Sequence, residues 1–160
     1  MKTVSKIIVG LSIGGLLISL KYFDIDIPLA DSGLMDIYSK YSNSFASGNL
    51  LRAVAIVESG EKADAYNPND PSYGLMQILY TGSNKFYIDG WPPDSSDQLF
   101  NPDYNVKLGA QILGWNINTY GFMRGIMCYN NWSAREGHIP GVSWDYFFKV
   151  VVTYYRLGGS

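Results

Sequence analysis

A single carboxylate stands at the end of an apolar segment, in a position that would raise its pKa. In residues 50–57 every residue except Arg52 is apolar, without alternation, which predicts a helix buried on most sides. Gly60 is a typical C-cap, so Glu58 falls in the last turn. Burial and the negative end of the helix dipole both penalise the anion. The pattern therefore indicates a partly protonated acid that can donate a proton.

The neighbouring residues leave two ordinary roles open for Glu58. Its side chain can turn toward solvent, or it can pair with Arg52 or Lys62. In both cases the charged form would be stabilised by water or by a cation, and the acid would be unsuited to proton donation.

The composition indicates one globular domain and excludes several functions. Of 160 residues, 47% are apolar and 16% charged, which is enough to form a core. A net charge of −2, with no run of Lys or Arg after Lys6, argues against nucleic acid as a partner. One Cys and one His exclude an internal disulfide and make a metal site implausible, so we expect no metal and no cofactor. The 13 Tyr and 4 Trp suit a sugar-binding groove and an ordinary core equally well.

Residues 1–30 have the charge pattern of an export segment. Lys2 and Lys6 precede fourteen uncharged residues at 7–20, fewer than the roughly 20 of a membrane-spanning helix. This pattern is typical of a signal peptide, but the cleavage signal is poor, so residues 1–23 are equally consistent with an uncleaved membrane anchor. A buried N-terminal helix is the remaining alternative. Export across a membrane is the expectation.

Capping signals predict most of the other elements. Residues 31–48 form a linker or short helix, and Ser47 supplies an N-cap for the helix that carries Glu58. Asn101-Pro102 begins the clearest helix, which Gly121 ends. Two more helices and a short strand with an internal glycine are expected at 122–129, about 143–157 and 73–79. The fold class is therefore mainly α with a small β element.

Four short motifs follow one another in the order found in a known family. They are Glu58-Ser59, Gly74-Leu75-Met76-Gln77-Ile78, Tyr129-Asn130 and Tyr146. With these motifs, the sequence from about Asn49 to Leu157 resembles the lytic transglycosylases of the SLT, goose-type-lysozyme-like superfamily. The resemblance implies a lysozyme-like α+β domain over residues 49–160.

The resemblance also implies an activity on peptidoglycan glycan strands. In this family a glutamate, matched by Glu58, protonates the oxygen between MurNAc and GlcNAc. It then takes the proton of the C6 hydroxyl, which closes a 1,6-anhydro ring on MurNAc. The sugar's own acetamido group stabilises the cation, so the reaction needs no water, metal or cofactor.

The family's substrate-binding roles carry over to eight further residues. Tyr146 matches the tyrosine that orients the catalytic glutamate, and Met76 and Gln77 would meet sugar N-acetyl groups. Gly74 would let the backbone approach the ligand closely. The predicted substrate-binding residues are Ser59, Gly74, Leu75, Met76, Gln77, Tyr129, Asn130 and Tyr146. The chain departs from the family pattern at Asn131-Trp132, where smaller residues are usual, so a bulkier groove wall is expected there.

Two other functions and several biological settings stay open. A lysozyme-like hydrolase would need a second carboxylate about 6.5–9.5 Å from Glu58 to activate water, with Asp64 or Asp70 as candidates. The other function is that of a non-catalytic cell-wall-binding or assembly protein, which would bind glycan in the groove without cleaving it. One setting is a phage, in which the protein belongs to the virion or to the lysis system. The other is a bacterial secretion or conjugation apparatus, in which the protein faces the periplasm or cell wall. Its partners would then be virion or secretion-complex proteins.

Overall fold

The protein is mainly helical, with a small three-stranded sheet beside the helices. The computed structural model describes residues 25–81, 88 and 91–159, and the strand backbone at four places before residue 25. The α-helices of this part are α1 (Ser32–Lys40), α2 (Gly48–Ser59), α3 (Pro102–Tyr120), α4 (Phe122–Asn130) and α5 (Gly141–Arg156). Two 3-10 helices are η2 (Ser96–Phe100) and η3 (Trp132–Glu136). The predicted mainly α class with a small β element is confirmed.

The sheet is antiparallel, with its strands in sequence order. Its strands are β5 (Tyr66–Asn67), β6 (Ser72–Tyr73) and β7 (Ile78–Leu79), with Tyr73 opposite both Tyr66 and Ile78. Residues 74–77 form the tight turn between β6 and β7. The predicted strand over 73–79 is therefore two short strands joined by this turn.

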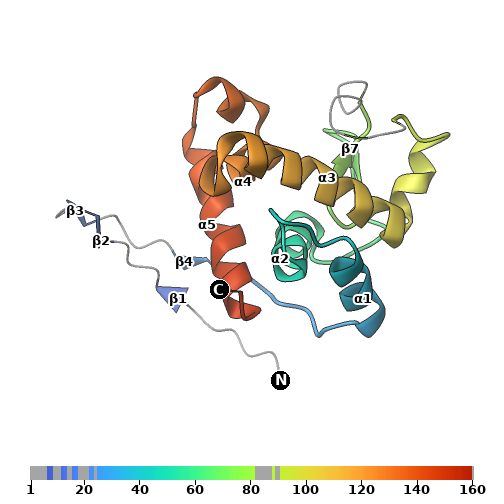
Figure 1. Ribbon diagram of the computed structural model, residues 1–160, viewed down its shortest axis with the longest axis horizontal. Coiled ribbons are helices and arrows are strands. Elements are labelled where there is room, and N and C mark those ends of the chain that lie inside the picture. Colours follow the sequence, from blue (N-terminus) through green and yellow to red (C-terminus); the bar gives the residue numbers. More distant parts are fainter. Residues whose placement is uncertain are drawn as a thin grey trace.

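Helix α2 is the centre of the core, as its apolar sequence predicts. Figure 1 shows it between α1 and α5, with α3 passing beside it. Residues 50–56 are all buried along this helix. The Ser47 hydroxyl accepts from Leu50 N at its start, and Gly60, with φ 66°, ends it in the left-handed conformation. Both predicted caps are confirmed, and they fix Glu58 in the last turn.

Helices α3 and α4 pack closely against each other. The Asn101 side chain accepts from Tyr104 N, and Pro102 occupies the first turn, as predicted. Gly121 ends α3, and α4 follows directly. The helices approach closely at Gly125, where a Cβ would collide with the backbone of Ile117. This close packing positions the end of α4 against the sheet.

The predicted N-terminal anchor or signal segment lies largely outside the described residues. The described part of this segment consists of four two-residue strands that form two pairs. Strand β1 (Ile7–Ile8) pairs with β4 (Tyr22–Phe23), and β2 (Ser12–Ile13) pairs with β3 (Leu16–Leu17). These eight residues therefore do not form the expected helix; the segment's Gly and β-branched residues are poor helix formers. Among all described residues, no helix combines the length and hydropathy needed to cross a membrane.

Candidate active site

Glu58 lies where two hollows of the surface meet. A cleft of about 570 Å³ is lined by the end of α2, the sheet and its loops, the end of α4 and η3. A smaller hollow of about 350 Å³ lies between α2 and α5 and includes Tyr146 and Lys149. Glu58 and Asn130 line both hollows. A long ligand that occupies both hollows would therefore place one of its inner units, rather than an end, next to Glu58.

The environment of Glu58 favours its protonated form. The pKa of Glu58 is raised from its ordinary value of 4.5 to about 7; burial is the largest cause, and the negative charge of Asp70 acts in the same direction. The Tyr146 hydroxyl donates to Glu58 Oε1 at 2.6 Å and opposes this shift, because the bond stabilises the anion. The same bond holds the carboxyl in one orientation. Glu58 is thus an oriented acid that carries a proton for part of the time near neutral pH.

The nearest buried cation on α2 is committed elsewhere. Arg52 forms a two-pronged ion pair with Glu61, with Nε to Oε1 at 3.0 Å and Nη2 to Oε2 at 3.2 Å. Its Nη2 also donates to the Pro28 carbonyl at 3.0 Å. Both side chains of the pair are buried. The alternative in which Arg52 neutralises Glu58 is therefore wrong, and the pair leaves the pKa of Glu58 raised.

The turn over residues 74–77 is held in place by buried hydrogen bonds. The Asn105 side chain on α3 accepts from Met76 N at 2.8 Å and donates to the Tyr73 and Leu99 carbonyls at 2.8 and 2.7 Å. From α2, the Ser59 hydroxyl donates to the Leu75 carbonyl at 2.8 Å. These bonds join the turn to two helices, so its position relative to Glu58 is fixed.

Three residues of the Gly-Leu-Met-Gln motif serve packing, contrary to the contacts expected of them. Leu75 and Met76 are fully buried, and Met76 packs against Gly109, so neither side chain reaches the cleft. The side chains of Leu75 and Met76 fill the core. The main-chain groups of the same two residues bind Ser59 and Asn105. Gly74 has φ 74°, and a Cβ there would overlap the Leu99 carbonyl and the Asn105 amide. The close approach at Gly74 is therefore to the Leu99 carbonyl and the Asn105 side chain of the protein itself.

The remaining predicted site residues do lie together around the cleft. Gln77 lines it with φ 46°, and its side-chain amide donates to the Gly74 carbonyl at 2.9 Å. Tyr129 lines it as well, and its hydroxyl donates to the Met76 carbonyl at 2.9 Å. Burial raises the pKa of Tyr129 well above its usual range, so the phenol stays neutral. Asn130, at the end of α4, is exposed beside Glu58. Contact of these side chains with a sugar stays a prediction.

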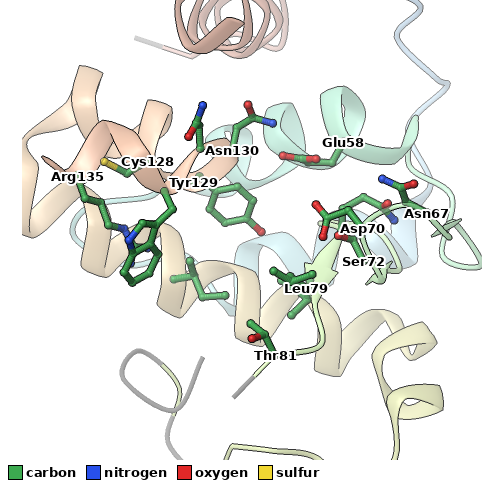
Figure 2. A pocket seen from close by; sticks show the side chains of 15 residues that line it. Glu58, Asn67, Asp70, Ser72, Leu79, Thr81, Cys128, Tyr129, Asn130 and Arg135 are labelled. Carbon is green, nitrogen blue, oxygen red and sulfur yellow. The ribbon is translucent and has the colours of Figure 1, made fainter. Parts of the chain in front are cut away.

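Asp70 is expected from the sequence only in the alternative hydrolase mechanism, as one of two candidates for the second carboxylate. It is exposed in the loop between β5 and β6 and lines the same cleft as Glu58. Figure 2 shows both carboxylates at the same end of the cleft, Glu58 on α2 and Asp70 on the sheet side. Asp64, the other candidate, is exposed and is not among the residues that line the cleft. A loop rich in turn formers gave no signal to separate these two, because their positions depend on how the loop folds back.

The site offers groups for proton transfer and for polar contacts with a ligand. In the described ranges, no three side chains of His, Cys, Asp or Glu gather in a way that could hold a metal ion. Figure 2 shows the arrangement: Glu58 above, Asp70 on the sheet side, Tyr129 between the walls and Arg135 at the opposite end. The chemistry within reach is general acid and base catalysis by Glu58.

Sequence comparisons identify two similar proteins of Escherichia coli. A peptidoglycan-binding-like protein of Escherichia coli O157:H7 is 29% identical, over 68% of this chain and 70% of its own length. A putative peptidoglycan-binding-like protein of E. coli K12 is 36% identical over 41% of this chain, and the match spans 46% of that protein.

Solved structures share the fold. An inactive mutant of the lytic transglycosylase Slt of Pseudomonas aeruginosa superposes with a TM-score of 0.57 and 23% identity, over 84% of this chain. The 70-kDa soluble lytic transglycosylase of E. coli gives 0.55 and 22%, over 82%. The matches span only 23% of each of these larger proteins. The sequence profile of the transglycosylase SLT domain matches residues 37–137. Since this match covers more than half of the chain and contains Glu58, the protein belongs to the SLT family of lytic transglycosylase domains, with its lysozyme-like fold.

Proposed function

We propose that the protein is a peptidoglycan lytic transglycosylase that cleaves the β-1,4 bond between MurNAc and GlcNAc and leaves a 1,6-anhydro-MurNAc end. The observation that carries this proposal is the position of Glu58, a raised-pKa acid held by Tyr146 where the two hollows meet. Family membership and the names of the relatives support the same substrate.

In the proposed reaction Glu58 transfers two protons in opposite directions. Its carboxylic acid gives a proton to the glycosidic oxygen, and the bond from that oxygen to C1 of MurNAc breaks. The acetamido oxygen of the same sugar stabilises the positive charge at C1. The Glu58 carboxylate then takes the proton of the C6 hydroxyl, and O6 bonds to C1. Glu58 ends in its starting state, and no water is consumed.

Product mass tests this proposal directly. Purified peptidoglycan is digested with the full-length protein, and the released muropeptides are analysed by mass spectrometry. A transglycosylase gives anhydro ends, each lighter by one water than the product of hydrolysis. Products with reducing ends would overturn the transglycosylase assignment, and the absence of any release would overturn the enzymatic function.

The rate should fall as pH rises through the pKa of Glu58. The first step needs the protonated acid, whose pKa lies at about 7, so the protonated fraction falls from about nine-tenths at pH 6 to about one-tenth at pH 8. The measurement is the initial rate of muropeptide release between pH 5 and 9. A glutamate with its ordinary pKa of 4.5 would already have lost activity at pH 6.

Two substitutions should move this alkaline limb in opposite directions. Asp70→Asn removes a negative charge from the cleft, so the Glu58 anion is less disfavoured and the limb moves to lower pH. Tyr146→Phe removes the hydrogen bond that stabilises the anion, so the limb moves to higher pH, with a lower maximal rate because the carboxyl loses its orientation. Asp97→Asn, at an exposed position in η2, is the matched control and should leave the profile in place. If the alkaline limb moved in the same direction in both variants, the roles assigned to Asp70 and Tyr146 in setting the pKa of Glu58 would be wrong.

A peptidoglycan hydrolase is the second candidate, because Asp70 lines the same cleft as Glu58. In that mechanism Asp70 would activate a water molecule as general base. Asp70→Asn would then lower the maximal rate by about 10² or more, instead of shifting only the pH profile. The same variant therefore separates the two reactions without product analysis.

We further propose that residues 1–23 direct the protein across a membrane, either as a cleaved signal segment or as a membrane anchor that leaves the domain facing the periplasm or cell wall. The paired lysines and the uncharged run that follows them support export. A phage lysis system or virion and a secretion or conjugation apparatus are the settings that need such local cleavage. Fractionation of producing cells, with N-terminal sequencing of the protein, tests whether the segment stays attached.

A further inference from the structure

An exposed tryptophan lines the cleft and has no part in the proton transfers proposed above. Trp132 begins η3 and keeps 52% of its surface exposed while lining the cleft. Figure 2 places its neighbour Arg135 at the end of the cleft away from Glu58. A large aromatic side chain exposed inside a concave site is typical of a ligand contact.

The indole of Trp132 is held from behind by a cation. The Arg135 guanidinium carbon lies 3.6 Å from the centre of the Trp132 ring, so it covers one ring face. Arg135 is fixed in turn, because its Nη2 donates to Oδ1 of the buried Asn116 on α3 at 3.0 Å. With Arg135 packed on the ring, Trp132 still keeps about half of its surface exposed within the cleft.

The backbone of η3 is also anchored. Arg124 on α4 donates from Nε to the Ala134 carbonyl at 2.8 Å and from Nη2 to the Arg135 carbonyl at 2.7 Å. The Asn131 side chain accepts from Ser133 N at 3.0 Å and caps the turn that carries the tryptophan. A side chain fixed in this way loses little conformational entropy when a ligand binds, which favours affinity.

We propose that Trp132, backed by Arg135, is a stacking platform for one pyranose ring of the glycan strand, at a subsite remote from the cleaved bond. One face of a GlcNAc-type ring presents C–H groups that can lie flat on the indole, while the hydroxyl and acetamido groups stay directed to the side. The sheet side of the same cleft carries Leu79 and Thr81, which adds a mixed apolar and polar surface for the strand. The platform gives the protein a preference for longer strands. This inference rests on the proposed function, because it assumes a glycan in the cleft.

Binding of GlcNAc oligomers of increasing length tests the platform. These probes carry no peptide, so they report on sugar contacts alone. Isothermal titration calorimetry is carried out on the full chain with Glu58→Gln as the parent, so that no turnover occurs. The parent should gain affinity as the oligomer becomes long enough to reach η3. Adding Trp132→Ala should weaken binding of the longest oligomer by about tenfold or more and leave the dimer unchanged, while Trp132→Phe keeps part of the gain.

Trp144→Ala is the matched control, because Trp144 is also exposed but lies on α5 outside the residues that line the cleft. Its binding should equal that of the parent at every length. Equal affinities of the parent and Trp132→Ala for the longest oligomer would overturn the platform, as would an equal loss at every length. Failure of the proposed function looks different: the wild-type protein then releases no muropeptides and the parent binds no oligomer.

Discussion

Replacing Glu58 by Gln should lower the rate of muropeptide release by about 10³-fold, within the range typical of a lost general acid. The amide has the shape of the carboxylic acid and can still accept the hydrogen bond that Tyr146 donates at 2.6 Å. It cannot give up a proton to a leaving oxygen. The fold and the cleft should therefore persist while the reaction stops, and GlcNAc oligomers should still bind.

Glu136→Gln is the control for this substitution, because it makes the same change at an exposed position in η3. It should keep the wild-type rate. Full release by Glu58→Gln would show that another group supplies the proton. If the wild-type protein also released nothing while binding glycan, the non-catalytic binding function would replace the enzymatic one.

Stability provides a second readout of the same carboxyl. The pKa of Glu58 is about 7 in the folded protein and near 4.5 in the unfolded chain, so the folded state binds more protons between these values. The protonated Glu58 therefore adds its whole contribution to the free energy of unfolding below about pH 4.5, and this contribution is lost as pH rises through 7. Glu58→Gln removes this dependence, and the variant should gain stability relative to wild type at pH 8 compared with pH 5. Equal differences at the two pH values would place the carboxylate in solvent.

The elements around Glu58 were predictable because their signals are local. Ser47, Gly60 and the Asn101-Pro102 pair act through hydrogen bonds and dihedral angles within a few residues. The apolar run before Glu58 likewise predicts a buried helix without knowledge of its neighbours. Burial of that helix was enough to predict the direction of the pKa shift.

The details of the cleft depend on contacts between distant residues, and here the sequence was insufficient. Met76 was expected at the substrate because it belongs to a motif, yet its side chain packs on Gly109 of α3. The pairing of Arg52 with Glu61 depends on the left-handed turn after α2, which brings Glu61 back to the helix. Asp70 lines the same cleft as Glu58 only because of the way the loop between two short strands folds. The pattern of residue types along the sequence does not specify where these side chains point in the fold.

The strongest of these distant contacts gives the largest expected effect on stability. Asn105 is fully buried, 29 to 32 residues from the turn that it binds, and its amide makes three hydrogen bonds to main-chain groups. Asn105→Ala would leave Met76 N and the Tyr73 and Leu99 carbonyls without this partner. Each buried polar group left unpaired costs roughly 1–3 kcal/mol, so we expect a loss of about 4 kcal/mol in the free energy of unfolding.

Urea unfolding followed by circular dichroism measures this loss, and thermal unfolding should show a fall in Tm of about 10 °C. Asn118→Ala, at an exposed position of the same helix, is the matched control and should stay within about 0.5 kcal/mol of wild type. Because the lost bonds hold the turn beside Ser59, Asn105→Ala should also reduce muropeptide release at temperatures where the protein is still folded. A loss of less than about 1 kcal/mol would mean that water replaces the amide at these groups. The turn would then owe its position to the packing of Met76 and to the Ser59 hydroxyl rather than to Asn105.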